Sequence, residues 1–164
     1  MTDSSLFDEK LLEIKNTKQA DFFKIEYNGE KIDFEMEDVL LPFGLEYDHN
    51  NNIYMAVEIS ENEIFFFIKN LESAIENKVR DFLDNSNLVL KSQIRFSKYG
   101  NIIKTKVPKV GNKIRVNCYK DNKRISIFDI EDWVHGDVII HLEYMWIKEN
   151  NIYYKWNLKK IALN

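Results

Sequence analysis

The chain has 164 residues, of which 45% are hydrophobic and 30% charged, a composition typical of one globular domain with an ordinary core. No apolar run approaches the roughly 20 residues of a membrane span. The acidic N-terminal sequence lacks the basic start and apolar centre of a secretion signal. Cys118 is the only cysteine, so an intramolecular disulfide is excluded and we expect an intracellular, reducing location.

Acidic and basic residues are divided between the two halves of the sequence. Residues 1–90 contain 20 acidic and 8 basic residues, whereas residues 91–164 contain 7 acidic and 15 basic residues. The basic excess is greatest in residues 91–128, where 11 basic residues accompany one acidic residue, Asp121. A charged run is usually only a solvated face. An excess of this size, in a segment that also has the pattern of strands, favours a polyanionic partner.

The acidic half begins with residues 1–20, which we expect to form an N-terminal arm or a short helix, followed by a single domain over residues 21–164. Asn28-Gly29 separates two strand-like segments and predicts a hairpin with a type I′ turn, because both residues tolerate positive φ angles. On the second of these segments the apolar residues alternate with acidic ones, which predicts one buried and one acidic face. Further strands are expected over 39–47 and 53–60.

A long helix is predicted over about residues 61–84. Ser60 and Glu63 have the spacing of a capping box at its start. Apolar side chains then recur at helical spacing, and we expect this stripe to cover one end or side of a sheet. The opposite side carries Lys69, Glu72, Glu76 and Arg80.

After residue 87 the sequence returns to strand-like segments, and residues 113–128 predict a basic hairpin. A two-residue turn at Asp121-Asn122 would pair Tyr119 with Arg124. The same register would pair Asn117 with Ser126 and Arg115 with Phe128. It directs the polar, basic and aromatic residues to one exposed face, and it directs four apolar residues to the core: Val116, Cys118, Ile125 and Ile127.

Such a face suits a single strand of nucleic acid. Basic side chains neutralise phosphates, and exposed rings stack on unpaired bases. We extend the candidate site along the neighbouring strands where basic or aromatic residues share a face. The predicted nucleic-acid-binding residues are Lys91, Arg95, Tyr99, Lys104, Lys106, Lys113, Arg115, Tyr119, Arg124, Phe128 and Lys155. The three tryptophans, Trp133, Trp146 and Trp156, are expected in the core.

Motifs for catalysis are weak in this sequence. The three histidines are scattered, and no glycine-rich phosphate loop or nucleophile motif occurs. Residues 129–137 carry four carboxylates and a histidine, but their spacing matches neither a calcium loop nor a zinc site. We therefore expect no enzyme, no cofactor and no metal. Two alternatives stay open: an interaction or virion-structural protein whose basic face docks an acidic partner, and a metal-dependent nuclease that uses residues 129–137.

The order of several segments resembles a known group of proteins. These segments are LPFGLEY (41–47), the long helix, SQIRFSKYG (92–100), TKVPK (105–109) and a closing GDVIIHLEYMWIKENNIYYKWNLKKI (136–161). Together they resemble the OB-fold single-stranded DNA-binding proteins of large double-stranded DNA viruses, related to those of tailed phages. The resemblance implies a Greek-key barrel that holds the strand in a basic, aromatic-lined groove.

The fold class we expect is α+β and mostly β, an OB-like Greek-key barrel or curved antiparallel sheet with one long helix. The expected function is non-sequence-specific binding of single-stranded DNA, which protects replication or recombination intermediates. RNA is not excluded as the ligand. A homo-oligomer or a replication-protein partner stays open, and no membrane partner is expected. For a viral protein, the location would be the host cytoplasm or the viral replication site.

Overall fold

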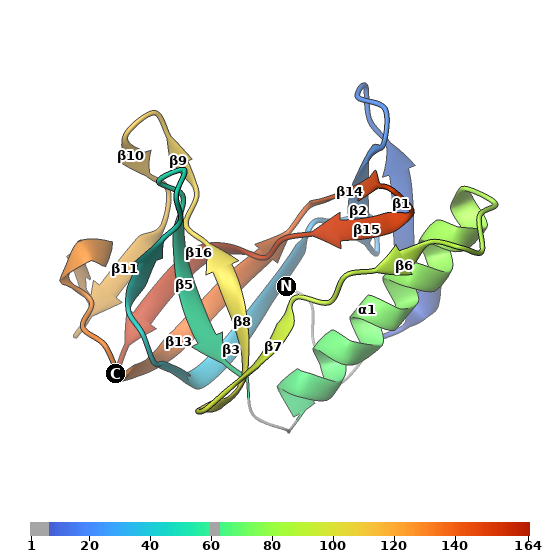
Figure 1. The fold of residues 1–164 in the computed structure, drawn as a ribbon. Coiled ribbons are helices and arrows are strands. Elements are labelled where there is room, and N and C mark those ends of the chain that lie inside the picture. Colours follow the sequence, from blue (N-terminus) through green and yellow to red (C-terminus); the bar gives the residue numbers. More distant parts are fainter. Residues whose placement is uncertain (1–6, 60–62) are drawn as a thin grey trace.

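The computed structural model describes residues 7–59 and 63–164 (Figure 1). One α-helix, α1 (Glu63–Phe82), occurs among these residues, and the rest is mainly strands. The strands are β1 (Leu12–Asn16), β2 (Phe22–Tyr27), β3 (Ile32–Leu41), β4 (Leu45–Tyr47), β5 (Ile53–Glu58), β6 (Val89–Leu90), β7 (Ile94–Ser97), β8 (Gly100–Lys106), β9 (Lys109–Val110), β10 (Lys113–Ile114), β11 (Asn117–Lys120), β12 (Lys123–Ile125), β13 (Val134–Leu142), β14 (Tyr144–Lys148), β15 (Asn151–Tyr154) and β16 (Asn157–Leu163). No helix within the described ranges has the length and apolar character to cross a membrane.

The strands form two main sheets. A curved nine-stranded sheet contains the order β12-β11-β16-β8-β5-β4, with β13 joining β16 to β3 and β7 lying beside β8. A five-stranded sheet has the order β1-β2-β14-β15-β6, and the short β9–β10 pair projects from the molecule (Figure 1). The expected class, a mostly β protein with a curved sheet and one long helix, is confirmed. The sheets are mixed and not purely antiparallel, because β16 runs parallel to both β11 and β8.

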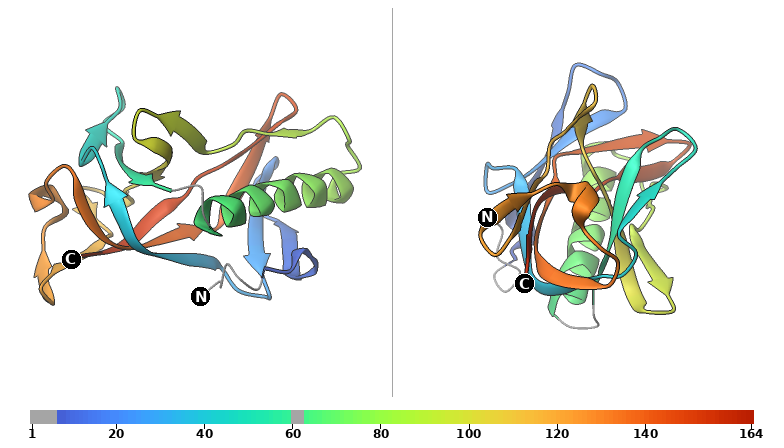
Figure 2. Two further views of the ribbon diagram at one scale, coloured as in Figure 1. Left: turned by 90° about the horizontal axis from the view of Figure 1, so that it is seen from below. Right: turned by 90° about the vertical axis from the view of Figure 1, so that its left-hand side faces the viewer.

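The core lies where the inner faces of the sheets meet α1. On β3, Ile32, Phe34 and Met36 are buried, as their alternation with acidic residues predicted. The ring of Phe67 on α1 stacks on Phe34, with ring centroids 4.4 Å apart. In Figure 1 the helix lies below β6 and β15, and Figure 2 shows it from two further sides. The predicted apolar stripe therefore covers one side of the sheets, while the predicted cap Ser60 lies outside the described residues.

The first strands of the chain pair differently from the predicted N-terminal arm and hairpin. Residues 12–16, expected within an arm or short helix, form strand β1 beside β2, and Leu12 is buried. The division into an arm of residues 1–20 and a domain of residues 21–164 stays a prediction. Asn28-Gly29 forms the expected turn, with φ angles of 51° and 77°. Beyond this turn, however, β2 and β3 separate and enter different sheets.

Three polar side chains of α1, those of Glu72, Glu76 and Arg80, are not solvated as a free helix face would be. The Glu72 carboxyl group is buried and accepts hydrogen bonds from Ser92 Oγ (2.7 Å), Gln93 N (2.9 Å) and Tyr154 Oη (2.7 Å). One turn further, Glu76 accepts from Leu90 N, and Arg80 Nε donates to Leu88 O. These side chains satisfy the backbone of residues 88–93, the segment that leads into β7. The helix thereby fixes the position of the first basic strand.

Glu72→Ala should lower the free energy of unfolding by about 2–4 kcal/mol, because it leaves several buried donors without an acceptor. Urea denaturation measures this loss. Asn77→Ala, an exposed change on the same helix, should cost less than about 1 kcal/mol. Equal effects of the two changes would contradict the role assigned to Glu72.

Candidate nucleic-acid interface

The turn of the basic hairpin forms as the sequence predicted. Asp121 and Asn122 have φ angles of 52° and 60°, and Tyr119 pairs directly with Arg124. Directly paired residues point to the same face of a sheet, so the Tyr119 ring and the Arg124 side chain share one face. The Lys160 ammonium group lies 5.5 Å from the centre of the Tyr119 ring. Of the four predicted inward residues, Val116, Cys118 and Ile127 are buried, and Ile125 is partly buried against the core.

The hairpin is shorter than predicted, and the pairs Asn117–Ser126 and Arg115–Phe128 are wrong. Strand β12 ends at Ile125, and Ser126 caps a 3₁₀ helix over Ile127–Asp129 by accepting a hydrogen bond from Phe128 N (3.2 Å). Serine side chains that bond nearby backbone compete with strand pairing in this way. On the other strand, Arg115 N donates to Pro108 O, so this residue belongs to the β9–β10 region.

A row of directly paired residues crosses five strands on the outer face of the curved sheet. Tyr54 on β5 pairs with Lys106 on β8, and Lys106 pairs with Asn157 on β16. Asn157 pairs with His141 on β13, and His141 pairs with Asp33 on β3. All five side chains are half-buried. The row therefore brings together polar and charged residues from distant parts of the sequence on one surface.

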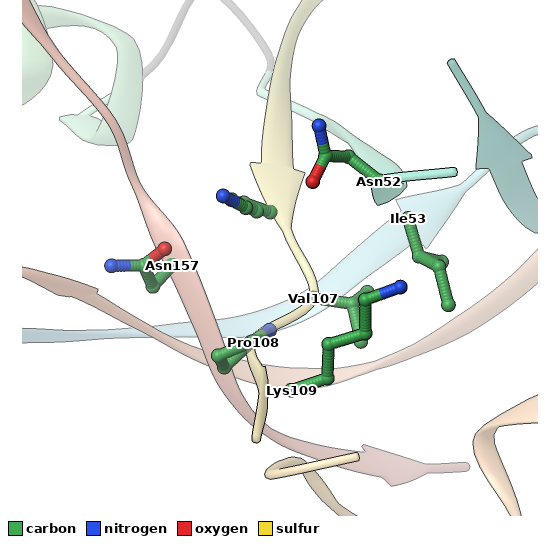
Figure 3. A pocket seen from close by; sticks show the side chains of 7 residues that line it. Asn52, Ile53, Val107, Pro108, Lys109 and Asn157 are labelled. Carbon is green, nitrogen blue, oxygen red and sulfur yellow. The ribbon is translucent and has the colours of Figure 1, made fainter. Parts of the chain in front are cut away.

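Three adjoining depressions follow this row, and we call them together the basic furrow. The first has a volume of about 300 Å³ and is lined by Tyr54, Gln93, Arg95, Lys104 and Lys155. The second, about 260 Å³, is lined by Asn52, Ile53, Lys106, Val107, Pro108, Lys109 and Asn157 (Figure 3). The third, about 360 Å³, is lined by Lys31, Pro108, Arg115, His141, Glu143, Asn157, Leu158 and Lys159.

The three depressions are neighbours along the row of paired residues. The first and second meet at the Tyr54–Lys106 pair, and the second and third share Pro108 and Asn157. In Figure 3, Asn52 and Asn157 lie on either side of the end of β8. Eight lysine or arginine residues line the furrow, against one carboxylate, that of Glu143. The lining of the furrow is therefore mainly positively charged, which suits a polyanion.

Five of the eleven predicted site residues line the basic furrow: Arg95, Lys104, Lys106, Arg115 and Lys155. The other six lie away from it: Lys91, Tyr99, Lys113, Tyr119, Arg124 and Phe128. Sequence reasoning left Tyr54, Lys31, Lys109 and Lys159 outside the site. Lys31 and Tyr54 belong to the acidic half, where the charge balance gave no signal. Lys109, by contrast, lies in the basic segment and was detectable.

Lysines in the furrow repel one another. Partial burial lowers the pKa of Lys106, and the positive charges of Lys155 and Lys109 lower it further. The Lys155 ammonium lies 5.6 Å from the centre of the Tyr54 ring and 3.4 Å from its hydroxyl oxygen. A phosphate group in this position would offset the repulsion between the ammonium groups. A base stacked on Tyr54 would lie beside that phosphate.

Carboxylates form ion pairs with three of the furrow's lysines: Lys159, Lys104 and Lys31. Asp33 accepts hydrogen bonds from Lys159 and from His141, and Glu46 forms an ion pair with Lys104 at 3.2 Å. Partial burial alone would raise the pKa of Asp33, but the hydrogen bonds and charges of Lys159 and His141 outweigh it and hold the pKa below its usual value. Glu143 has a lowered pKa for the same reason, through His141 and Lys31.

The candidate nucleophile and the candidate metal-binding segment from the sequence lie in surroundings that do not favour those roles. Burial raises the pKa of the Cys118 thiol to about 11, which makes it a weak nucleophile. Asp137, in the acidic segment 129–137, accepts a hydrogen bond from Asp38 N at a bulge of β3. Residues 7–59 and 63–164 contain no group of three or more metal-ligating side chains.

One tryptophan departs from its predicted place. Trp156 is fully buried and Trp146 is half-buried, but Trp133 is 54% exposed. Trp133 has a positive φ of 61°, and its backbone N–H donates a hydrogen bond to Leu41 O. The centre of its ring lies 4.8 Å from the centre of the Tyr99 ring. The bound backbone directs this ring to a surface cluster and away from the core.

No family model and no curated protein matches the sequence. The fold is similar to solved structures of the single-stranded DNA-binding protein from bacteriophage Enc34. The protein alone aligns with a TM-score of 0.55 at 9% identity, over 92% of this chain and 89% of that one. Its complex with single-stranded DNA aligns with a TM-score of 0.54 at 11% identity, over 92% and 94%. A C-terminal truncation aligns with a TM-score of 0.56 at 11% identity, over 94% and 95%.

The lowered pKa values of Asp33 and Glu143 predict a loss of stability in acid. A lowered folded-state pKa stabilises the fold above the unfolded value, near pH 4, and this contribution disappears as the pH falls through the folded pKa. The urea midpoint should therefore fall between about pH 5 and about pH 3, and less steeply in Asp33→Asn. Glu35→Gln, which removes an exposed carboxylate from the same strand, should keep the wild-type pH profile. The same steepness in all three proteins would contradict the prediction.

Proposed function

We propose that this protein binds single-stranded DNA without sequence specificity, along the basic furrow. The observation that carries the proposal is the gathering of eight basic side chains in three neighbouring depressions. Phosphate neutralisation supplies affinity that is independent of base sequence.

A single strand fits the furrow better than a duplex does. The half-buried Tyr54 lies among the basic side chains of the first depression, where an unpaired nucleobase can stack on its ring. In a duplex the faces of the bases are already stacked. The likeness in fold to a phage protein solved with single-stranded DNA supports the same ligand class. Because the 2′-hydroxyl leaves no signature in these residues, RNA is included as a ligand to be tested.

The biological setting belongs to the same proposal. A protein of this kind protects replication or recombination intermediates, and a virus related to tailed phages or a large double-stranded DNA virus would be its source. It would then act inside the host cell, at the viral replication site, without catalysing a reaction. A protein that docks an acidic protein partner, or a metal-dependent nuclease that uses residues 129–137, would give different results in the experiments below.

The affinity for single-stranded DNA should fall steeply with salt. If about five of the furrow's lysine and arginine side chains contact phosphates, the logarithm of the association constant should fall with log salt at a slope of roughly −3.5. Fluorescence anisotropy with an oligothymidine strand measures this slope, and a duplex of equal length is the control. Equal affinity for the duplex, or a slope near zero, would favour the docking of a protein partner. Cleavage of DNA with added magnesium or manganese would favour the nuclease.

Two aromatic variants separate the furrow from the basic hairpin as the binding surface. Tyr54→Ala should weaken binding of the oligothymidine strand by about 1–3 kcal/mol, the usual worth of one stacked base. Phe128→Ala removes a ring that is 57% exposed and lies outside the furrow, and it should change affinity by less than about 0.5 kcal/mol. The reverse order of effects would move the site to the hairpin. Thermal denaturation of both variants checks that they fold.

A further inference from the structure

The third depression of the furrow contains a network of alternating charges. Asp33 accepts from both Lys159 and His141, and His141 also contacts Glu143 at 3.3 Å. Glu143 in turn forms an ion pair with Lys31 at 3.2 Å. Asp33, which lies between Lys159 and His141 in this network, belongs to β3, the strand of the acidic half that pairs with β13.

The contacts of Asp33 are those that a phosphate group would make. A carboxylate and a phosphate both accept hydrogen bonds from an ammonium group and an imidazole through charged oxygens. Lys159 is therefore already neutralised by an anion of the protein itself. Arg115 and Lys109, which line the furrow nearby, form no ion pair within residues 7–59 and 63–164. The furrow thus contains basic side chains that have a carboxylate partner and others that, within those residues, do not.

We propose that Asp33 is an internal competitor for the DNA phosphate at Lys159. This inference rests on the proposed function and concerns regulation of the same site. In the free protein Asp33 forms an ion pair with Lys159. A DNA strand in the furrow binds first at the basic side chains that have no carboxylate partner among the described residues, such as Arg115 and Lys109. It then has to displace Asp33 before it contacts Lys159. The Lys159 side chain is 54% exposed and can turn toward a phosphate, whereas the Asp33 side chain is 23% exposed and keeps its hydrogen bond from His141.

The decisive experiment compares Asp33→Asn with Glu35→Gln. Both changes remove one negative charge from the same strand, but Glu35 is exposed and makes no ion pair in the part of the chain that the structure describes. Asp33→Asn should free Lys159 to neutralise one more phosphate and steepen the salt slope by about 0.7. Between about 200 mM and about 50 mM salt, that slope gives an additional gain in affinity of about 2.6-fold. Glu35→Gln should leave the slope unchanged.

A second pair of variants tests whether Asp33 acts through Lys159. In a Lys159→Gln background, adding Asp33→Asn should change neither the affinity for the oligothymidine strand nor the salt slope. A gain that persists in this background, or an equal gain in Glu35→Gln, would reduce Asp33 to a long-range repulsive charge and overturn the proposal. Urea denaturation of each variant shows whether it is folded at the assay temperature.

The failure of this inference is distinguishable from that of the proposed function. If the wild-type protein does not bind the oligothymidine strand, the proposed function fails and this inference fails with it. If the wild-type protein binds with a salt slope near −3.5 but Asp33→Asn behaves like the wild type, only the competition by Asp33 is overturned.

Discussion

The surface of this protein depends on the point where the chain passes from one sheet to the other, between β15 and β16. Strand β15 belongs to the five-stranded sheet and β16 to the nine-stranded sheet, with Lys155 and Trp156 between them. The Trp156 side chain is fully buried. The backbone carbonyl oxygen of Trp156 accepts a hydrogen bond from Lys106 N at 2.9 Å. Burial of so large a side chain is a major contribution to core stability. It fixes Lys155 and Asn157, on either side of it, at the surface beside Lys106. The basic furrow is thus a consequence of how the core closes.

Local patterns in the sequence predicted the local structure well. The Asp121-Asn122 turn and the alternation on β3 need only the preferences of neighbouring residues. The helix needs only its apolar spacing, and its observed bounds of Glu63–Phe82 lie within two residues of the predicted ones at each end. The register at Tyr119–Arg124 followed from the same local preferences.

Contacts between distant segments could not be predicted in this way. Glu72 has the spacing of an exposed helical residue, yet the groups that donate hydrogen bonds to its carboxylate lie 20 to 82 residues further along the chain. Tyr54 joins the candidate site only because β5 pairs with β8, and Lys31 joins it only because β3 pairs with β13. A sequence pattern describes which face a residue occupies, whereas the pairing of strands decides which faces become one surface. The acidic half therefore contributes to a site that the charge balance assigned wholly to the basic half.

The net charge of −4 does not oppose the binding of a polyanion. At physiological ionic strength the screening length is about 8 Å, so a phosphate in the furrow interacts mainly with the groups that line it. Those groups are mostly positive, whereas carboxylates such as Glu35 and Glu37 lie exposed further along β3. Glu143, which lines the furrow, and Asp33 and Glu46 beside it each form an ion pair with one of the furrow's lysines. Local pairing, and not total charge, therefore sets how many basic side chains of the furrow lack a carboxylate partner. An acidic protein can in this way combine solubility at high concentration with a surface that attracts nucleic acid.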